Sequence, residues 1–503
     1  MPEGKNGLIV FAISLGLFVA TINNSITSAA VTHIIEDLNG FERLNLIFTA
    51  YVLASTSTML IFGKLSDQFG RKLIYLIGLG FFGLGSLLSG LAQSFDQLVA
   101  FRAVQGIGQG AVFPVSFSII YSIYADPRKQ ARMAAVLSGI YGLAAFFGPL
   151  IGGLILEFAG WRWCFHLNVP IALVSFLIVL FAVRESRADT KPKVDYPGTI
   201  ALIATVVSFM LALDGAGKGW QSMWQTVVLF AVAAAAAVFF ILIELKASEP
   251  ILPPGLYRKR TIVAISLGVF CQGAMMMPLL SYLPVFVTSV LGFGSSYAFL
   301  TVLLLSVTAG AAVFSFLHQR FSYTVLILSS KLLGFLALLM IIAIGFEARG
   351  WYLAGLLIML GFAGLGPLMS VAQNEMAANL EARALGTGSS LIGFWRNMGN
   401  VIGTTLTAAI VNAGYSRSIA GSDAFASAAP ESRAVMANPD ALIGGETAGL
   451  DASAVDAMRE SLAAAVDSGF LAVAAFAALG AVSALAAGSV RNVRRTVHPP
   501  KAN

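Results

Sequence analysis

Charged residues are scarce in this sequence. Asp, Glu, Lys and Arg make up only 11% of its 503 residues, and hydrophobic residues make up 57%. A soluble globular chain has about 25% charged residues. The imbalance therefore excludes an ordinary soluble protein and indicates that most of the chain contacts lipid. Because a backbone in hydrocarbon must satisfy its own hydrogen bonds, and the apolar runs are too long for barrel strands, we expect helices.

Cysteine is also rare. Cys164 and Cys271 lie within or next to apolar segments, which excludes a disulfide framework and a cysteine metal site. We interpret both as packing residues and expect no metal and no cofactor. The net charge is +6. The cations lie in short loops, so they indicate membrane orientation and not a nucleic-acid partner.

Apolar runs of roughly 20 residues predict an all-α membrane protein with fourteen transmembrane helices. The first run exceeds the roughly 7–15 residues of a signal-peptide core, so we expect an uncleaved first span. The fourteen expected ranges are 7–31, 44–63, 73–92, 96–124, 132–157, 165–184, 196–214, 223–245, 261–288, 296–317, 324–345, 351–378, 387–414 and 467–490.

The distribution of cations predicts the orientation. With both termini placed in the cytoplasm, 21 of the 31 Lys and Arg residues fall in cytoplasmic segments, 7 in external segments and 3 within helices. Cytoplasmic loops carry such an excess in membrane proteins. We therefore expect a multi-pass protein of the bacterial inner (plasma) membrane with cytoplasmic N- and C-termini.

One connection is long. Residues 415–466 are rich in Ala, Ser, Asp and Gly and are acidic overall. The part from Asp451 to about Val466 could form a surface helix capped by Asp451 or Ser453. We expect a solvated external loop, with a lid over the external mouth as the alternative.

Charged and glycine residues are concentrated between the second and third runs. The segment Gly63-Lys64-Leu65-Ser66-Asp67-Gln68-Phe69-Gly70-Arg71-Lys72 resembles the loop signature of the major facilitator superfamily at every fixed position. The resemblance implies two six-helix bundles that work by alternating access. It also implies that Asp67 contacts the start of a helix near Gly386, Thr387 and Gly388, where a carboxylate is favoured, and that Arg71 ties the loop to neighbouring carboxylates. Gly63, Asp67, Gly70 and Arg71 are thus the expected gating residues.

Two further motifs resemble the fourteen-helix drug:proton antiporter branch of that superfamily. Arg102-Ala103-Val104-Gln105-Gly106 lies in the fourth helix. An arginine there is costly in lipid and needs a polar partner, so Arg102 is our candidate for proton coupling, with Gln105 on the same helix face. The fifth helix carries Gly139 and then Gly148, Pro149, Gly152 and Gly153, a pattern that implies export by antiport.

The second half has three charged candidates for the cavity or for coupling. Arg396 lies roughly 15 Å into its helix, so we expect a buried partner. Lys331 is explained equally by snorkelling and by substrate contact. Glu375 is either paired with Arg383 or involved in proton transfer.

The first helix departs from the resemblance. Relatives have a carboxylate where this chain has Asn23, followed by Asn24. An amide cannot release a proton near neutral pH, so a carboxylate–arginine coupling scheme loses its carboxylate. Both asparagines remain candidate cavity residues.

The domain prediction is a bundle over 1–190, two inserted transmembrane helices over 191–250, and a second bundle over 251–503 that includes the loop 415–466 and a basic cytoplasmic tail. The expected function is export of amphipathic or hydrophobic compounds in exchange for protons, with the proton gradient as energy source. The alternative is a lipid or amphipathic-metabolite flippase with weak or no proton coupling.

Other classes of protein find less support in the sequence. A membrane sensor would not need the alternating-access motifs. An enzyme is not expected, because the spans contain no paired carboxylates, nucleophile constellation or phosphate-binding glycine loop. The expected partners are small amphipathic substrates and the lipid bilayer, and the chain is expected to be a monomer.

Overall fold

The computed structural model describes residues 3–38, 45–124, 126–185, 195–217, 223–247, 250–293, 297–343, 349–381, 384–443 and 450–487, with some side chains of the first and fifth helices left out. Every regular element in these ranges is a helix. The first half contains α1 (Glu3–Leu38), α2 (Asn45–Phe69), α3 (Arg71–Gly90), α4 (Phe95–Ile123), α5 (Pro127–Ala159), α6 (Trp163–His166) and α7 (Asn168–Ala182), followed by α8 (Tyr196–Gly217) and α9 (Met223–Glu244).

The second half begins with a short helical turn. It contains α10 (Pro254–Tyr257), α11 (Arg260–Val285), α12 (Tyr297–Leu317), α13 (Tyr323–Ala343), α14 (Gly350–Ile358), α15 (Gly366–Asn379), α16 (Leu385–Ala420), α17 (Asp423–Ser427), α18 (Pro430–Met436), α19 (Pro439–Ile443) and α20 (Ala452–Ala486). Two π-helical segments, Phe286–Val290 and Met359–Leu365, continue α11 and join α14 to α15.

Helices occupy all fourteen ranges that the sequence predicts, but only twelve helices in the described residues are long and apolar enough to be candidate membrane spans. The two helices outside this set are α5 and α16. Several side chains of α5 are not described, although it has no charged residue from Met133 to Leu156, and α16 is rich in Gly, Ser, Thr and Asn. Both helices contact protein on several sides: α5 lies against α1 and α12, and α16 against α2, α11 and α20.

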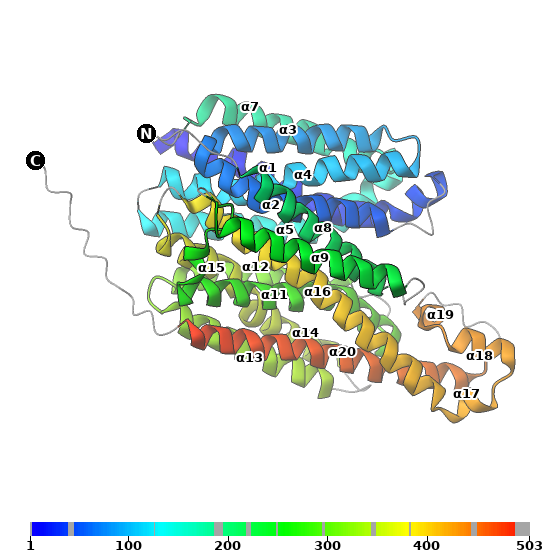
Figure 1. The fold of residues 1–503 in the computed structure, drawn as a ribbon. Helices are drawn as coiled ribbons and strands as arrows, with labels where there is room; N and C mark the ends of the chain where they lie inside the picture. The colour runs from blue at the N-terminus through cyan, green and yellow to red at the C-terminus, as the bar shows by residue number, and fades with distance from the viewer. Residues whose placement is uncertain are drawn as a thin grey trace, which may run out of the picture.

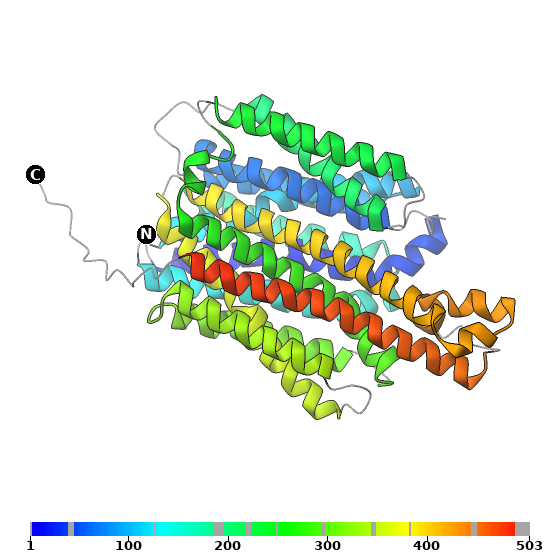
Figure 2. The ribbon, with the colours of Figure 1, turned by 60° about the horizontal axis from the view of Figure 1, so that its bottom comes forward.

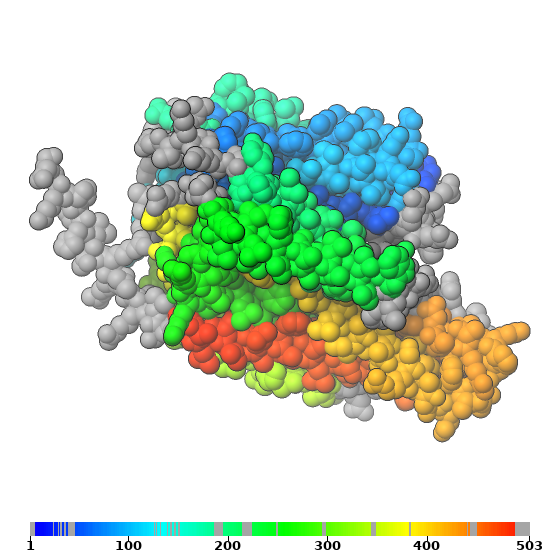
Figure 3. All heavy atoms as spheres, in the orientation of Figure 1, coloured from blue at the N-terminus to red at the C-terminus, as the bar shows by residue number. Residues whose placement is uncertain are grey.

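The long helices run side by side in two groups (Figure 1). Helices α1–α7 form one half, and α11–α16 with α20 form the other. Along one side α2 meets α16, and along another α5 meets α12. The inserted pair α8–α9 lies across the first of these seams, because α8 contacts both α2 and α16 (Figures 1 and 3). We call the end at which α1 begins the Asp67 end, and the other the α17–α19 end.

The expected solvated loop over 415–466 is wrong, although the helix expected from Asp451 is present as the first part of α20, with Asp451 at its N-cap. The first residues of this segment extend α16, its last residues begin α20 at Ala452, and three short helices lie between. At 1.5 Å per residue, the 36-residue α16 and the 35-residue α20 are each over 50 Å long, whereas the hydrocarbon core of a bilayer is about 30 Å thick. Both helices project beyond the other long helices at the α17–α19 end and carry α17–α19 (Figure 2).

An apolar core explains why this projection is folded. Tyr415, Met436 and Met458 are buried in it, and the Tyr415 hydroxyl donates to the Met436 carbonyl at 2.7 Å. These residues belong to the same cluster as the core of the second half. Residue composition suggested a solvated loop because Ala and Ser dominate it, but a few apolar side chains are enough to pack a short helical hairpin.

An ion pair joins α1 to the turn after α5. Arg162 Nη1 lies 2.6 Å from Asp37 Oδ2, and the Trp161 indole donates to the same oxygen at 3.0 Å. Hydrogen bonds from Arg162 and Trp161 hold the pKa of Asp37 below its usual range. Trp161 and Arg162 therefore hold the α17–α19 end of α1 against the turn after α5.

Close helix crossings give a testable consequence. A Cβ at Gly85 of α3 would overlap the backbone of Gln105 on α4, whereas a Cβ at Gly80 of the same helix would meet open space. We expect Gly85→Ala to lower the stability of the purified protein by about 1–3 kcal/mol. Gly80→Ala should leave the melting temperature unchanged or raise it, since alanine favours helix. Equal melting temperatures for the two variants would contradict this crossing.

Candidate functional site

A carboxylate latch joins the two halves at the Asp67 end. Asp67, near the end of α2, accepts hydrogen bonds from the backbone N–H groups of Gly386 and Thr387, each at 2.8 Å, and from the Thr387 hydroxyl at 2.9 Å. These groups belong to the first turn of α16, where backbone donors have no partner within the helix and the helix dipole favours an anion. The contact predicted for Asp67 is therefore present.

Two glycines allow this approach. A Cβ at Gly63 would overlap Ser390 of α16, and a Cβ at Gly386 would overlap Ser66 of α2. The backbones of α2 and α16 thus meet almost directly, which brings Asp67 within reach of the donors. Gly63 in the sequence motif and Gly386 outside it have the same role on the two helices.

The turn after the latch needs its second glycine. Gly70 has φ +106°, a conformation that a side chain would strain, and a Cβ there would overlap the carboxylate of Glu185. Arg71 Nη2 lies 3.8 Å from Asp67 Oδ1. Glu185 Oε2 accepts a hydrogen bond from the backbone N–H of Leu73 at 3.1 Å. Glu185 therefore caps α3 beside the latch. The sequence prediction missed it because no motif includes the residue.

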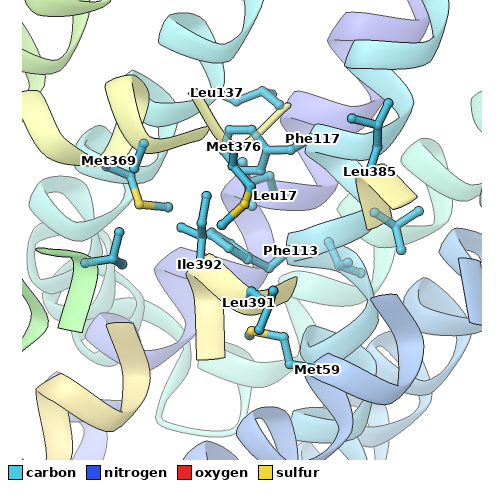
Figure 4. Packing of buried hydrophobic residues seen from close by; sticks show 14 of the residues in the cluster. Leu17, Met59, Phe113, Phe117, Leu137, Met369, Met376, Leu385, Leu391 and Ile392 are labelled. Carbon is cyan, nitrogen blue, oxygen red and sulfur yellow. The ribbon is translucent and has the colours of Figure 1, made fainter. Parts of the chain in front are cut away.

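An apolar seal lies next to the latch. One cluster of buried side chains includes residues of both halves (Figure 4). From the first half it includes Leu17, Met59, Phe113, Phe117 and Leu137, and from the second half Met369, Met376, Leu385, Leu391 and Ile392. At the Asp67 end the two halves therefore share a single core.

The opposite end is organised differently. There the buried residues form two separate clusters, one within the first half around Ile26, Phe95 and Phe165, and one within the second half around Phe286 and Phe470. Among the described residues, the halves share a core at the Asp67 end and have separate cores at the other, so the molecule is closed at the Asp67 end.

Arg102 lies in a buried polar network of the first half. Its side chain is fully buried, donates to Gln105 Oε1 at 2.7 Å and to the Ile47 carbonyl at 3.3 Å, and stacks on the Tyr51 ring with 4.2 Å to the centroid. The polar and aromatic contacts offset the cost of burying a guanidinium.

The network continues through neutral side chains. Gln105 donates to Asn23 Oδ1 at 3.0 Å and to Ser86 Oγ at 2.9 Å, and Asn168 donates to the same two oxygens at 3.0 Å. The network thus joins α1, α3, α4 and α7. Ser86 was missed because a serine in an apolar helix has no distinctive sequence signal. Asn24 lies next to Asn23, but its side chain is outside the described residues.

A cavity of about 290 Å³ lies between the halves, beside α8. Arg396 lines it, and its guanidinium lies over the Phe113 ring at 4.6 Å. The polar lining also includes Gln109, Asn397 and Asn400. The apolar lining includes Phe48, Val52, Leu53, Met59, Phe113, Met210, Met277 and Val401. The structure therefore places Arg396 at a cavity wall.

Lys331 lies away from this cavity. Its side chain is fully buried within the second half, and Nζ lies 3.4 Å from the Gly364 carbonyl and 3.8 Å from Met275 Sδ. Gly364 belongs to the π-helical segment, whose wider turn leaves carbonyls for other donors. The ammonium therefore binds an internal carbonyl, and the snorkelling interpretation is wrong.

Glu375 has two partners in the described residues, and the expected partner Arg383 lies outside the described residues. The Glu375 carboxylate lies 3.2 Å from His318 Nε2 and accepts a hydrogen bond from Asn379 at 3.0 Å. Its neighbour Asn374 accepts a hydrogen bond from Tyr121 of the first half at 3.2 Å. An imidazole–carboxylate pair therefore lies next to a contact between the halves.

The glycines of α5 have separate environments. A Cβ at Gly148 would overlap Ser25 of α1, so this glycine allows a close crossing. Gly139 faces Thr308 of α12, Gly152 is buried, and Gly153 meets open space. The side chain of Pro149 is outside the described residues. The motif therefore lies on a helix that contacts both halves.

Sequence comparison identifies relatives. Residues 13–404 match the family model described as Major Facilitator Superfamily. The chain is 32% identical over 408 residues to "Multidrug resistance protein 3" of Bacillus subtilis (strain 168), covering 80% of this chain and 79% of that protein. It is 30% identical over 418 residues to "Multidrug transporter protein MdtP" of the same organism, covering 82% and 76%.

Solved structures share the fold. The human organic anion transporter MFSD10 has a TM-score of 0.58 at 14% identity, covering 94% of this chain and 100% of that one. A bacterial homolog of the human lysosomal transporter Spinster, in an inward-facing and unoccupied conformation, has a TM-score of 0.55 at 18% identity, covering 97% and 98%.

The latch generates a prediction about opening. Asp67→Asn removes the charge from a site where three donors converge, and hydrogen bonds to charged groups are worth about 1.5–3 kcal/mol. We expect the open-to-closed ratio at the Asp67 end to rise at least about tenfold. A cysteine replacing the buried Ser390 should then react faster with a thiol reagent, against a low background from the buried Cys164 and Cys271.

Asp126→Asn is the matched control. Its carboxylate caps α5 by accepting from the Arg128 N–H within its own half. The control should leave the labelling rate of the cysteine at position 390 unchanged. If Asp67→Asn also leaves it unchanged, the carboxylate does not hold the halves together.

Proposed function

The chain belongs to the Major Facilitator Superfamily, and on that premise we propose that it exports amphipathic organic compounds in exchange for protons by alternating access. The observation that carries the proposal is the asymmetry between the two ends. The halves share a latch and an apolar seal at the Asp67 end and have separate cores at the other. This is the arrangement expected of a carrier that has closed one side of a central cavity.

The proposed topology has fourteen transmembrane helices. Twelve are candidate spans by composition, and we infer that α5 and α16 also cross the membrane, since each runs the length of its neighbours between protein surfaces. The polar and small residues of α16 suit a helix that is largely buried against other helices, and α5 has no charged residue from Met133 to Leu156. The Asp67 end carries Lys64, Arg71 and Lys72, which supports a cytoplasmic location for this end in the plasma (inner) membrane.

The cavity lining suggests the kind of substrate. Met59, Met210 and Met277 offer adaptable apolar contacts beside Phe113, which suits compounds of varied shape. Among the described residues, the lining includes Arg396 and no carboxylate. A bound cation would lie near a like charge, so neutral or anionic amphipathic compounds are the proposed substrates. The names of the relatives, with "multidrug" among them, support broad specificity.

Proton coupling requires a group that can titrate. The amides of Asn23 and Gln105 cannot take up and release a proton, whereas Glu375 and His318 bear a carboxyl group and an imidazole that face each other at 3.2 Å. A proton added to Glu375 would remove the charge that faces His318, and a proton added to His318 would strengthen the pair. Both groups lie near Asn374, which contacts Tyr121 of the other half. We therefore assign the proton site to Glu375 with His318, and give Arg102 the role of holding the first half together.

The alternative function is flipping or export of a lipid or amphipathic metabolite without strict proton coupling. Asn23 favours it, because a helix-one amide replaces the carboxylate of related antiporters. Both functions use the same cavity and the same latch, so only the dependence on the pH gradient separates them.

Everted vesicles test proton coupling. Adding a neutral or anionic amphipathic compound should partly collapse an imposed pH gradient in wild-type vesicles. Glu375→Gln should abolish that collapse while preserving exchange of labelled for unlabelled compound, because exchange needs alternating access without net proton movement. Glu381→Gln, which neutralises the exposed carboxylate after α15, should behave as wild type.

Two outcomes would alter this assignment. Transport without any collapse of the gradient in wild-type vesicles would favour the uncoupled alternative. An unchanged collapse in the Glu375→Gln vesicles would remove Glu375 from the coupling mechanism.

Arg396 generates a prediction about substrate charge. At an effective dielectric constant of about 20, opposite charges about 5 Å apart attract by about 3 kcal/mol. Arg396→Gln should therefore lower affinity for an anionic compound at least about tenfold and change affinity for its uncharged ester little. Binding to the purified protein would measure both. Asn397→Gln, which alters the same wall without changing charge, is the control, and equal losses for acid and ester would contradict the charge argument.

A further inference from the structure

A second cavity, of about 960 Å³, lies at the Asp67 end on the seam between α5 and α12. It is separate from the latch, which lies on the α2–α16 seam. Its lining comes from both halves: Arg128, Lys129, Arg132, Ala135, Val136 and Gly139 from α5, and Thr308, Ala312, Ser315, Phe316, Gln319 and Arg320 from α12 and the residues after it.

The charge of this lining is of one sign. Arg128, Lys129 and Arg132 lie in the first two turns of α5, and Arg320 follows α12 on the other half. None of the described residues that line the cavity is acidic. The nearby carboxylate of Asp126 caps α5 by accepting from the Arg128 N–H. The start of α5 adds the positive end of a helix dipole, so the cavity favours an anion.

The lining changes character along both helices. On α5 the cations at 128, 129 and 132 are followed by Ala135, Val136 and Gly139 at helical spacing. On α12 Arg320 and Gln319 are preceded by Phe316 and Ala312. Val136 and Phe316 are 40% and 59% exposed. The cavity therefore has a cationic rim and an apolar wall that runs along the helices away from the Asp67 end.

We propose that this cavity binds the headgroup of an anionic phospholipid, with the rim cations on the phosphate and the apolar wall along the first part of an acyl chain. Basic pockets between transmembrane helices at a membrane surface suit such headgroups. A soluble phosphate would use the same cations, but it would leave the apolar wall without a partner. The combination of both surfaces favours the lipid.

The site joins the two halves, so binding affects the conformation. Closing the Asp67 end brings the α5 cations and Arg320 around one cavity, where like charges repel. An anion between them offsets that repulsion only while the halves are close. A ligand that binds one conformation better shifts the population toward it, so the lipid stabilises the closed Asp67 end. This inference goes beyond the exported substrate and depends only on the α5–α12 seam.

The experiment compares the full chain in phosphatidylcholine nanodiscs with and without phosphatidylglycerol. Spin labels on α5 and α12 at the Asp67 end report the seam distance, and melting temperature reports binding. Phosphatidylglycerol should narrow the distance distribution and raise the melting temperature. Near a membrane each cation contributes about a fivefold gain in binding. The double variant Arg132→Gln with Arg320→Gln should therefore need about 25 times more phosphatidylglycerol for the same change in seam distance and melting temperature.

The matched control is Arg258→Gln with Arg260→Gln, which removes two exposed cations near the start of α11, outside the cavity. It should retain the lipid response of the wild type. An equal loss in both double variants would show a general effect of surface charge and overturn the site. An undiminished response in the variant at 132 and 320 would overturn it as well.

A third arm adds inorganic phosphate to nanodiscs that lack phosphatidylglycerol. Phosphate should leave the seam distance of the wild type unchanged at concentrations that also leave the seam distance of the Arg258→Gln, Arg260→Gln control unchanged. If phosphate alone reproduces the narrowing, and loses its effect in the variant at 132 and 320, the site takes a soluble anion and the assignment to a lipid is overturned.

Discussion

The closed form of this transporter depends on one carboxylate at the start of one helix. Asp67 receives two backbone N–H groups and one hydroxyl from the first turn of α16. The two backbone donors have no partner in their own helix. Their hydrogen bonds to Asp67 therefore form without breaking any hydrogen bond within α16. The latch is also reversible, because water can replace the carboxylate when the halves separate. Gly63 and Gly386 make the approach possible, and Gly70 turns the chain immediately after it.

The latch alone would be a weak closure, and the apolar seal beside it supplies the remainder. Phe113, Leu391 and Met376 come from three helices and share one buried cluster at the Asp67 end. The hydrogen bonds of Asp67 are directional and fix the register between α2 and α16. The burial of apolar surface stabilises the contact but is non-directional. The two parts differ in what can disturb them: charge and protonation act on the latch, whereas substrate size and shape act on the seal.

The polar interior has three parts with different chemistry. The Arg102 network is built from amides, a hydroxyl and a guanidinium within the first half, and suits a fixed structural role. Lys331 binds the Gly364 carbonyl of a π-helical segment inside the second half. Of these three parts, the His318–Glu375 pair is the one that lies beside a contact between the halves and contains a carboxylate. For that reason the proposed proton site lies in the second half, although the first half contains the arginine motif.

The sequence by itself determined the helical class and the approximate places of the long helices, because hydropathy and backbone satisfaction in lipid leave few alternatives. The Asp67 contact was expected because the loop motif resembles that of the major facilitator superfamily. The sequence could not determine the partner of Glu375, the internal carbonyl bound by Lys331, the cap formed by Glu185 or the fold of residues 415–466. Each depends on which surfaces meet in space. Such partners lie many residues apart, as His318 and Glu375 do, and only tertiary packing brings them within hydrogen-bonding distance.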